Sequence, residues 1–386
     1  MTLASPLLSD RHRMIGEAVR KFADERIRPQ AQELDEAEAF PAEIYREMAA
    51  LGLFGITMPE ALGGAGADAL AYAVVMEELA RGYASVADQC GLVELVGTLL
   101  AEHGTAAQHD RYLRPLLRAE RRCAYALTEP EAGSDLSNLR TTATRAGDGW
   151  TLTGEKIWIH NAPVCDFACV LARTDPDAGH RGMSIFLVDR DAAGFEDGRK
   201  EHKMGQRASP VGALFFDGVE LPGDALLGPE NRGFHLMMSV LDKGRVGIGA
   251  LAVGILQAAL DASVEHANAR RQFGHAIAEF QAIQWLIADM AKSLHASRLL
   301  VRDAAQTLDR GERATLAASI AKCFATDAAV EHTSNAVQIY GGMGYVQGVE
   351  VERLYRDAKI TQIYEGTNQI QRSIIARELL AHGARE

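Results

Sequence analysis

The sequence predicts an α+β protein made of a helical domain, a small β-domain and a second helical domain, in that order. Two changes in the spacing of apolar residues predict this order, from helical to alternating near residue 120 and back to helical near residue 230. The 386 residues also suffice for two to three domains and a large buried core. We therefore expect domains at residues 1–120, 121–230 and 231–386.

The first part should be all-α. From Ser9 to about Leu117 apolar residues recur at helical spacing, as in Ile15, Val19 and Phe22. The second part, from about Cys123 to Leu227, has short alternating runs separated by Gly, Asp and Pro. These runs predict a small β-barrel or β-sandwich.

The third part should be a four-helix bundle, because long segments with helical spacing continue from Gly233 through Leu380. The longest apolar run, Val246 to Leu260, is interrupted by Gly and Gln and is too short to span a bilayer. We expect it to be a buried helix.

The N-terminus shows no basic region followed by an apolar stretch, so no targeting segment is expected.

Charge and cysteine content narrow the function classes. A formal net charge of -12 argues against a nucleic-acid partner or an anionic membrane surface, since binding to phosphates needs a cationic patch. The five cysteines form neither a dense framework nor a C-x-x-C pair, and no nearby histidines complete a zinc site. We expect reduced, mostly buried thiols in a cytoplasmic protein without a bound metal.

One carboxylate stands out near the C-terminus. Glu365 lies in a short polar break between two segments with helical spacing, with Asn368 as a possible helix cap and Gln371 three residues later. A tight turn between helices can aim such a side chain into a cleft. On its own, Glu365 would more often be a solvated loop residue.

Two further stretches carry polar and aromatic groups. Thr128 to Asp135 supplies hydroxyls, a glycine and backbone N–H groups suited to a flat heterocycle and a phosphate, although alone it could be an ordinary turn. In residues 154–162, Ile157 and Ile159 alternate with polar and aromatic residues as in a strand. Taken alone, Trp158 would be predicted to lie in the core.

In this order and at these distances, the three stretches resemble the acyl-CoA dehydrogenase family of flavoproteins. The resemblance runs from Ser9 to about Ala381. Four more motifs support it: Lys203-Met204-Gly205-Gln206-Arg207, Arg270-Arg271-Gln272-Phe273-Gly274, Gln338-Ile339-Tyr340-Gly341-Gly342-Met343-Gly344, and Arg356-Asp357-Ala358-Lys359-Ile360.

The resemblance implies FAD-dependent α,β-dehydrogenation of an acyl-CoA thioester to the trans-2-enoyl-CoA. Glu365 would abstract the α-proton, and the hydride would pass from Cβ to flavin N5. Electrons would go to an electron-transfer flavoprotein, and the protein would be a homotetramer, a dimer of dimers. Some members carry the base on an earlier helix, but that position is Gly244 here.

The resemblance also implies the binding residues. The flavin would lie against residues of one subunit: Tyr125, Leu127, Thr128, Gly133, Ser134, Trp158, Ile159 and His160. The adenylate end would lie against residues of a neighbour and then return to the first subunit: Arg270, Gln272, Phe273, Gln281, Gln338, Gly341 and Gly342, then Thr367 and Gln369. Substrate contacts would come from Ser134, Asp242, Arg245, Tyr364 and Gly366. Asp242 and Arg245 could instead form only an intrahelical ion pair.

Two residues depart from the family pattern. His160 replaces the usual Thr or Ser at flavin N5, which affects the redox potential and oxygen reactivity that we expect. Glu94 lies where the acyl tail is usually lined by small apolar residues. We expect Glu94 to point to solvent or to a buried polar partner such as His103, or else to bind substrate with a polar or cationic acyl tail.

Two other functions stay open. A flavin oxidase or monooxygenase on the same scaffold would use oxygen as acceptor, and His160 keeps this alternative open. A non-catalytic scaffold is disfavoured by the intact Glu365 and by the net charge. The length, branching and tail charge of the acyl chain do not follow from the sequence.

Overall fold

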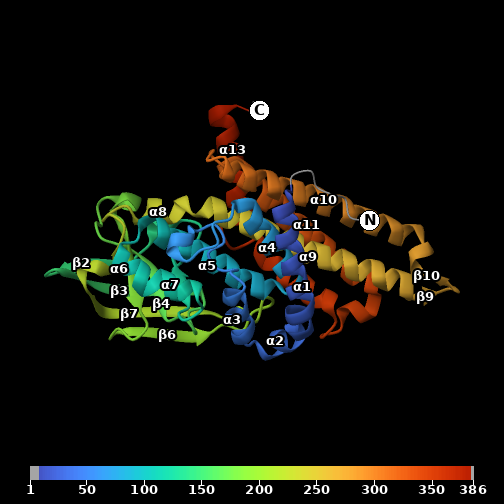
Figure 1. The fold of residues 1–386 in the computed structure, drawn as a ribbon, viewed down its shortest axis with the longest axis horizontal. Helices are drawn as coiled ribbons and strands as arrows, with labels where there is room; N and C mark the ends of the chain where they lie inside the picture. Colours follow the sequence, from blue (N-terminus) through green and yellow to red (C-terminus); the bar gives the residue numbers. More distant parts are fainter. Residues whose placement is uncertain (1–7, 384–386) are drawn as a thin grey trace.

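The computed structural model describes residues 8–383. The chain folds into two helical regions with a β-region between them (Figure 1), which confirms the predicted fold class. The N-terminal helices, in chain order, are α1 (Asp10–Phe22), α2 (Ala31–Ala37), α3 (Ala42–Ala50), α4 (Ala69–Gly82), α5 (Ala84–His103), α6 (Ala106–Gln108) and α7 (Arg114–Leu117). Helices α4 and α5 are buried along almost their whole length, so they form the centre of this region.

The β-region is an open, eight-stranded sheet folded over its own core. Its strands run in the spatial order β6-β7-β3-β2-β4-β5-β8, with β1 beside β4. Strands β2 and β4 pair only at Thr142 and Arg173, and Trp150, Phe186 and Phe216 fill the space inside. The region is therefore a sandwich and not a closed barrel. The strands are β1 (Cys123–Ala126), β2 (Thr142–Ala146), β3 (Gly149–His160), β4 (Phe167–Arg173), β5 (Met183–Asp189), β6 (Phe195–Lys200), β7 (Val211–Leu221) and β8 (Leu226–Leu227).

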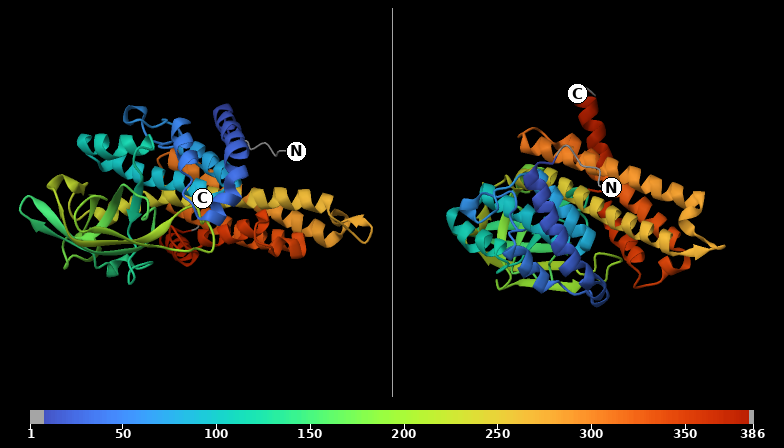
Figure 2. Two further views of the ribbon diagram at one scale, coloured as in Figure 1. Left: turned by 90° about the horizontal axis from the view of Figure 1, so that it is seen from below. Right: turned by 45° about the vertical axis from the view of Figure 1, so that its right-hand side comes forward.

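The C-terminal region is a helical bundle. Helices α9, α10, α11 and α12 pack together, and α13 projects away from them (Figure 1). The elements are α8 (Gly233–Ser239), α9 (Leu241–Ala269), β9 (Arg271–Gln272), β10 (His275–Ala276), α10 (Gln281–Asp309), α11 (Thr315–Tyr340), α12 (Glu350–Thr361) and α13 (Asn368–His382). The molecule is elongated, with the β-sandwich at one end and the β9–β10 hairpin at the other (Figure 2).

Two helical segments, Ala84–His103 and Gly233–Ala269, are long and apolar enough to cross a membrane, but 83% of each apolar window is buried inside the fold. They are core helices, as predicted for the run from Val246 to Leu260. All five cysteines are free and buried, in agreement with the sequence prediction.

A set of buried charges joins all three regions. Arg356 on α12 donates to Asp35 on α2 at 2.7 Å, and the neighbouring Asp357, fully buried, accepts from the backbone N–H of Gln206 in the β-region at 2.5 Å. Gly205 lies so close to the backbone of Arg356 that an added Cβ would come within 2.3 Å of its carbonyl oxygen. The junction therefore requires a glycine and a carboxylate at these positions.

Candidate active site

A cavity of about 890 Å³ lies where the three regions meet. Strand β3, helix α5, the start of α9 and the loop between α12 and α13 all contribute to its walls. The structure brings together most of the residues predicted to bind flavin or substrate: Tyr125, Leu127, Thr128, Gly133, Ser134, Trp158, Ile159, His160, Asp242, Arg245, Tyr364, Glu365 and Gly366.

The loop that carries Glu365 has an unusual backbone. Glu365 adopts φ 53° and Gly366 φ 85°, so two successive residues are left-handed. Thr367 caps the next helix, and its hydroxyl accepts from the backbone N–H of Ile370 at 3.2 Å. The expectation that Asn368 would be the cap is therefore wrong by one residue. Asn368 is instead the first helical residue and is buried.

Side chains from two helices hold this loop in place. Gln371 donates from Nε2 to the carbonyl oxygens of Glu365 at 3.2 Å and Gly366 at 3.0 Å. Lys322 on α11 donates from Nζ to Gly366 O and to Asn368 Oδ1, each at 2.9 Å. Lys322 is fully buried, and burial lowers its pKa to about 8. Lys322 was not among the predicted site residues, although a lone lysine in the apolar middle of α11 is a usable signal.

Glu365 points into the cavity, where few protein groups stabilise its negative charge. Its Oε2 is buried and has no hydrogen-bond partner within residues 8–383. Burial raises the pKa of Glu365 to about 7; Arg245 and Lys322 counteract this shift and Asp88 adds to it. Gly244 leaves the space that the carboxylate occupies, because a Cβ there would lie 2.9 Å from Oε2. Such a carboxylate can accept a proton near neutral pH.

Asp242 and Arg245 form the intrahelical ion pair considered above. Arg245 Nη1 donates to Asp242 Oδ1 at 2.6 Å, and Thr315 Oγ1 donates to Asp242 Oδ2 at 2.7 Å. Both residues also line the cavity. The ion pair and a contact to substrate are thus compatible.

The strand carrying Trp158 and His160 is interrupted. The pairing of β3 with β7 shifts register between Lys156 and Ile159, and Trp158 adopts φ 56°. Trp158 is 61% exposed at the cavity, so the expectation of a core tryptophan is wrong. The strict alternation of side chains expected for residues 154–162 is also wrong, because the bulge interrupts the strand. Trp158 and His160 nevertheless both line the cavity.

His160 contacts polar groups at the cavity wall. Its Nε2 lies 2.6 Å from Ser209 Oγ, and its Nδ1 lies 3.4 Å from Asp88 Oδ2. Burial lowers the pKa of His160; the Asp88 carboxylate opposes that shift and Lys203 adds to it. The imidazole is therefore held neutral at physiological pH.

Glu94 has a structural role in this chain. It is buried, and its carboxylate accepts from the backbone N–H of Ile56 at 2.8 Å and of Thr57 at 3.1 Å. It does not belong to the cavity wall, so its assignment as a substrate-binding residue is not supported. It does have a buried polar partner, but this is the loop of residues 56–57 and not His103.

The remaining predicted cofactor residues lie elsewhere. Helix α9 runs from the cavity to the far hairpin, and the 25 residues from Arg245 to Arg270 correspond to about 37 Å of helix. The far end collects Arg270, Gln272, Phe273, Gln281, Gln338, Gly341 and Gly342, while Thr367 and Gln369 begin α13 beside the Glu365 loop. Phe273 is 90% exposed there.

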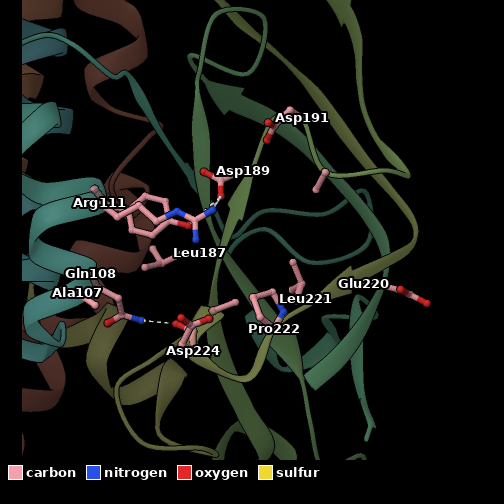
Figure 3. A pocket seen from close by; sticks show the side chains of 13 residues that line it. Ala107, Gln108, Arg111, Leu187, Asp189, Asp191, Glu220, Leu221, Pro222 and Asp224 are labelled. Carbon is pink, nitrogen blue, oxygen red and sulfur yellow. Dashed lines mark hydrogen bonds and ion pairs between the residues drawn. The ribbon is translucent and has the colours of Figure 1, made fainter. Parts of the chain in front are cut away.

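A second pocket of about 220 Å³ lies between α6 and the β-sandwich (Figure 3). Its basic side chain, Arg111, already donates to Asp189 at 2.6 Å, and Gln108 donates to the backbone oxygen of Asp224 at 2.8 Å (Figure 3). These groups connect the two regions, and none of the predicted site residues is among them.

Comparison with known proteins decides the family. Models of the acyl-CoA dehydrogenase N-terminal, middle and C-terminal domains match residues 9–120, 124–219 and 231–380. The chain belongs to the acyl-CoA dehydrogenase family. It is therefore an oxidoreductase of a family that depends on FAD.

Individual relatives cover nearly the whole chain. The CarC subunit of the caffeyl-CoA reductase-Etf complex of Acetobacterium woodii is 42% identical over 375 residues, which are 96% of this chain and 99% of CarC. Butyryl-CoA dehydrogenase from Megasphaera elsdenii superimposes with a TM-score of 0.94 at 38% identity, over 98% of this chain and 100% of the other. A structure described as PigA with FAD and proline gives a TM-score of 0.94 at 30% identity, over 99% and 100% of the chains.

Proposed function

We propose that this protein oxidises an acyl-CoA thioester to the trans-2-enoyl-CoA, with Glu365 as the base. The observation that carries the proposal is the Glu365 carboxylate, which lies in the cavity with a pKa raised to about 7 and a buried oxygen free of hydrogen bonds. A base for an α-proton needs this combination of access and basicity. The family membership supports the reaction class.

The loop supplies a second group for the reaction. Within residues 8–383 the backbone N–H of Glu365 donates to no protein acceptor, so it can donate to the thioester carbonyl. That hydrogen bond stabilises the negative charge that develops on the carbonyl oxygen as Glu365 removes the α-proton. The fixed loop backbone holds both groups in one geometry.

The residues present fit a flavin. Trp158 offers an exposed ring at the cavity, and space beside Gly133, Gly341 and Gly342 is open because an added Cβ would meet nothing within 4 Å. When bound, FAD supplies the hydride acceptor that no side chain can provide. Thr128, Ser134 and Trp158 would hold it from one subunit, and Arg270 from a neighbour would pair with its pyrophosphate.

The division of the cofactor residues supports a shared site in a homotetramer. The cavity residues and the Arg270 group lie at opposite ends of α9 in one chain, which supports a second copy as the source of the distal group. Large apolar side chains exposed on the C-terminal region, among them Trp285, Tyr345 and Leu380, fit an interface between copies.

We propose an electron-transfer flavoprotein as acceptor and a cytoplasmic location. The proposal of this electron acceptor is supported by CarC, a relative that belongs to a complex with Etf. The flavin oxidase remains the second candidate, because His160 occupies the position where the family pattern has a hydroxyl. Mixing the reduced enzyme with air and following flavin reoxidation separates the two, since reoxidation within one turnover time would favour the oxidase.

The base is tested by Glu365→Gln. We expect this variant to bind FAD and fold normally but to lose several orders of magnitude in kcat, because an amide matches the shape of the carboxylate and cannot accept the proton. Turnover is followed with acyl-CoA thioesters and an artificial electron acceptor. A kcat above about a tenth of the wild-type value would show that Glu365 is not the base.

A further inference from the structure

Asp88 is a further carboxylate in the cavity, beside Glu365 and Asp242, and no motif in the sequence marks it. It lies on α5, lines the cavity, and its side chain is only 12% exposed. Ser209 Oγ donates to its Oδ2 at 2.6 Å, and the His160 ring lies 3.4 Å from the same oxygen. Within residues 8–383, Oδ1 has no hydrogen-bond partner.

Within residues 8–383, no cationic side chain contacts this carboxylate, although burial lowers the pKa of Lys203 and the charge of Asp88 opposes that shift. His160 is held neutral by burial, and no Lys or Arg nitrogen of residues 8–383 lies within 4.0 Å of Asp88. Lys203 is nearby, but its Nζ donates to the carbonyl oxygens of Gln206 at 2.6 Å and Ser209 at 2.5 Å. A mostly buried carboxylate that no cation contacts can still gain a direct ion pair, and a ligand that brings a positive charge would supply it.

Asp88 also lies close to the reacting end of the cavity. Asp88 and Glu365 line the same cavity, and the charge of Asp88 adds to the rise that burial causes in the pKa of Glu365. Tyr72 adds a second polar group: it is 2% exposed, lines the cavity, and its hydroxyl has no hydrogen-bond partner within residues 8–383. The pocket that takes the acyl chain is therefore not uniformly apolar.

We propose that Asp88 makes this enzyme select acyl groups that carry a positive charge beyond Cβ. The inference rests on the proposed dehydrogenase function and names its substrate class. The Asp88 carboxylate attracts a cationic tail and repels an anionic one, so dicarboxylic acyl groups are disfavoured. Tyr72 and the apolar side chains of Leu92 and Leu95 surround the rest of the tail.

The test compares two thioesters of the same shape. γ-(Trimethylammonio)butyryl-CoA carries a fixed positive charge, and its carbon isostere has a quaternary carbon in place of the nitrogen. Both are assayed on the FAD-loaded enzyme with an artificial electron acceptor, and also as inhibitors of butyryl-CoA oxidation. The readout is the ratio of the two kcat/KM values, or of the two inhibition constants where one compound is not turned over.

Wild type should prefer the cationic thioester by about tenfold or more, and Asp88→Asn should remove that preference. Ser209→Ala keeps the carboxylate and should retain the preference, whereas its loss would show that Asp88 acts only by positioning Ser209 and His160. Asp148→Asn, the same change in the exposed β2–β3 turn, is the matched control.

Equal use of the two isosteres, a preference that survives Asp88→Asn, or failure of both to bind would overturn the inference while leaving the dehydrogenase function intact. Failure of all thioesters, butyryl-CoA included, would contradict the proposed function itself and with it the inference. FAD content and circular dichroism establish that each variant folds.

Discussion

At the scale of single residues, the raised pKa of Glu365 links activity to stability. Burial raises this pKa from 4.5 to about 7, so between these values the folded protein binds a proton that the unfolded chain does not. The stability associated with this group is complete below about pH 4.5 and is lost as the pH rises through 7. At pH 8 the ionised carboxylate therefore costs up to about 3 kcal/mol of unfolding free energy.

We expect Glu365→Gln to raise the melting temperature at pH 8 and to have a smaller effect at pH 5, because the amide carries no charge at either pH. Thermal unfolding of both proteins at the two pH values measures this. Glu17→Gln, at an exposed position on α1, serves as the control and should show no such pH dependence. The same stabilisation by Glu365→Gln at both pH values would contradict the buried-charge explanation.

The lowered pKa of His160 gives a second prediction. Because the imidazole is neutral above its ordinary pKa of 6.5, we expect the flavin reduction potentials of wild type and His160→Thr to diverge only below about pH 6.5. The variant should keep its activity, since a hydroxyl can also donate a hydrogen bond. Potentiometric titration from pH 5 to 8 measures this. Coincident curves would mean that His160 is a packing residue.

The polar break at Glu365 is a local feature of the sequence, but it was the resemblance to the acyl-CoA dehydrogenase family that marked this residue as the base. The sequence did not reveal Asp88, because α5 is buried on nearly all sides and helical spacing cannot show which side faces a cavity. The same ambiguity left two expectations open for Glu94, six residues along α5, and the structure shows the buried polar partner. The exposed Trp158 depended on a bulge, which alternation in a sequence does not report.

At the scale of elements, the loop between α12 and α13 depends on contacts from α11. Lys322→Met would remove two hydrogen bonds to this loop and a positive charge that lowers the pKa of Glu365. We expect kcat to fall and the acidic limb of the kcat/KM profile to move up by roughly half a unit to one unit. Lys292→Met, on the exposed face of α10, is the matched control. An unchanged profile would show that Lys322 has no electrostatic effect on the base.

The order of elements followed from periodicity, which long segments display clearly. The ends of elements were predicted less well than their order. The N-cap of α13 was predicted one residue too late, because Thr367 and Asn368 are both good caps and only the backbone geometry decides between them. The loop contacts of Lys322 join residues more than forty positions apart in the chain, so they could not be read from spacing. The domain boundaries stay a prediction.

At the scale of the whole molecule, the distance along α9 makes cofactor binding depend on assembly. We expect light scattering to give a tetramer with one FAD per chain, and Arg270→Met to weaken FAD binding by about tenfold or more, since it removes the charge that pairs with the pyrophosphate. Arg271→Met, the same change at the adjacent exposed residue, is the control. A monomer that holds stoichiometric FAD would contradict the shared site.

The buried charges around Arg356 and Asp357 have a consequence for how such chains evolve. The groups that meet there come from three regions: Asp35 from the N-terminal helices, Gln206 from the β-region, and Arg356 and Asp357 from α12. If one region is exchanged, the charged groups of the others lose their hydrogen-bond partners. We therefore expect the three segments to unfold as one cooperative unit and to recombine poorly between relatives. A chimera that replaces only the β-sandwich must therefore keep a glycine at position 205 and a backbone N–H in place to bond Asp357. Otherwise the junction beside the cavity loses its order.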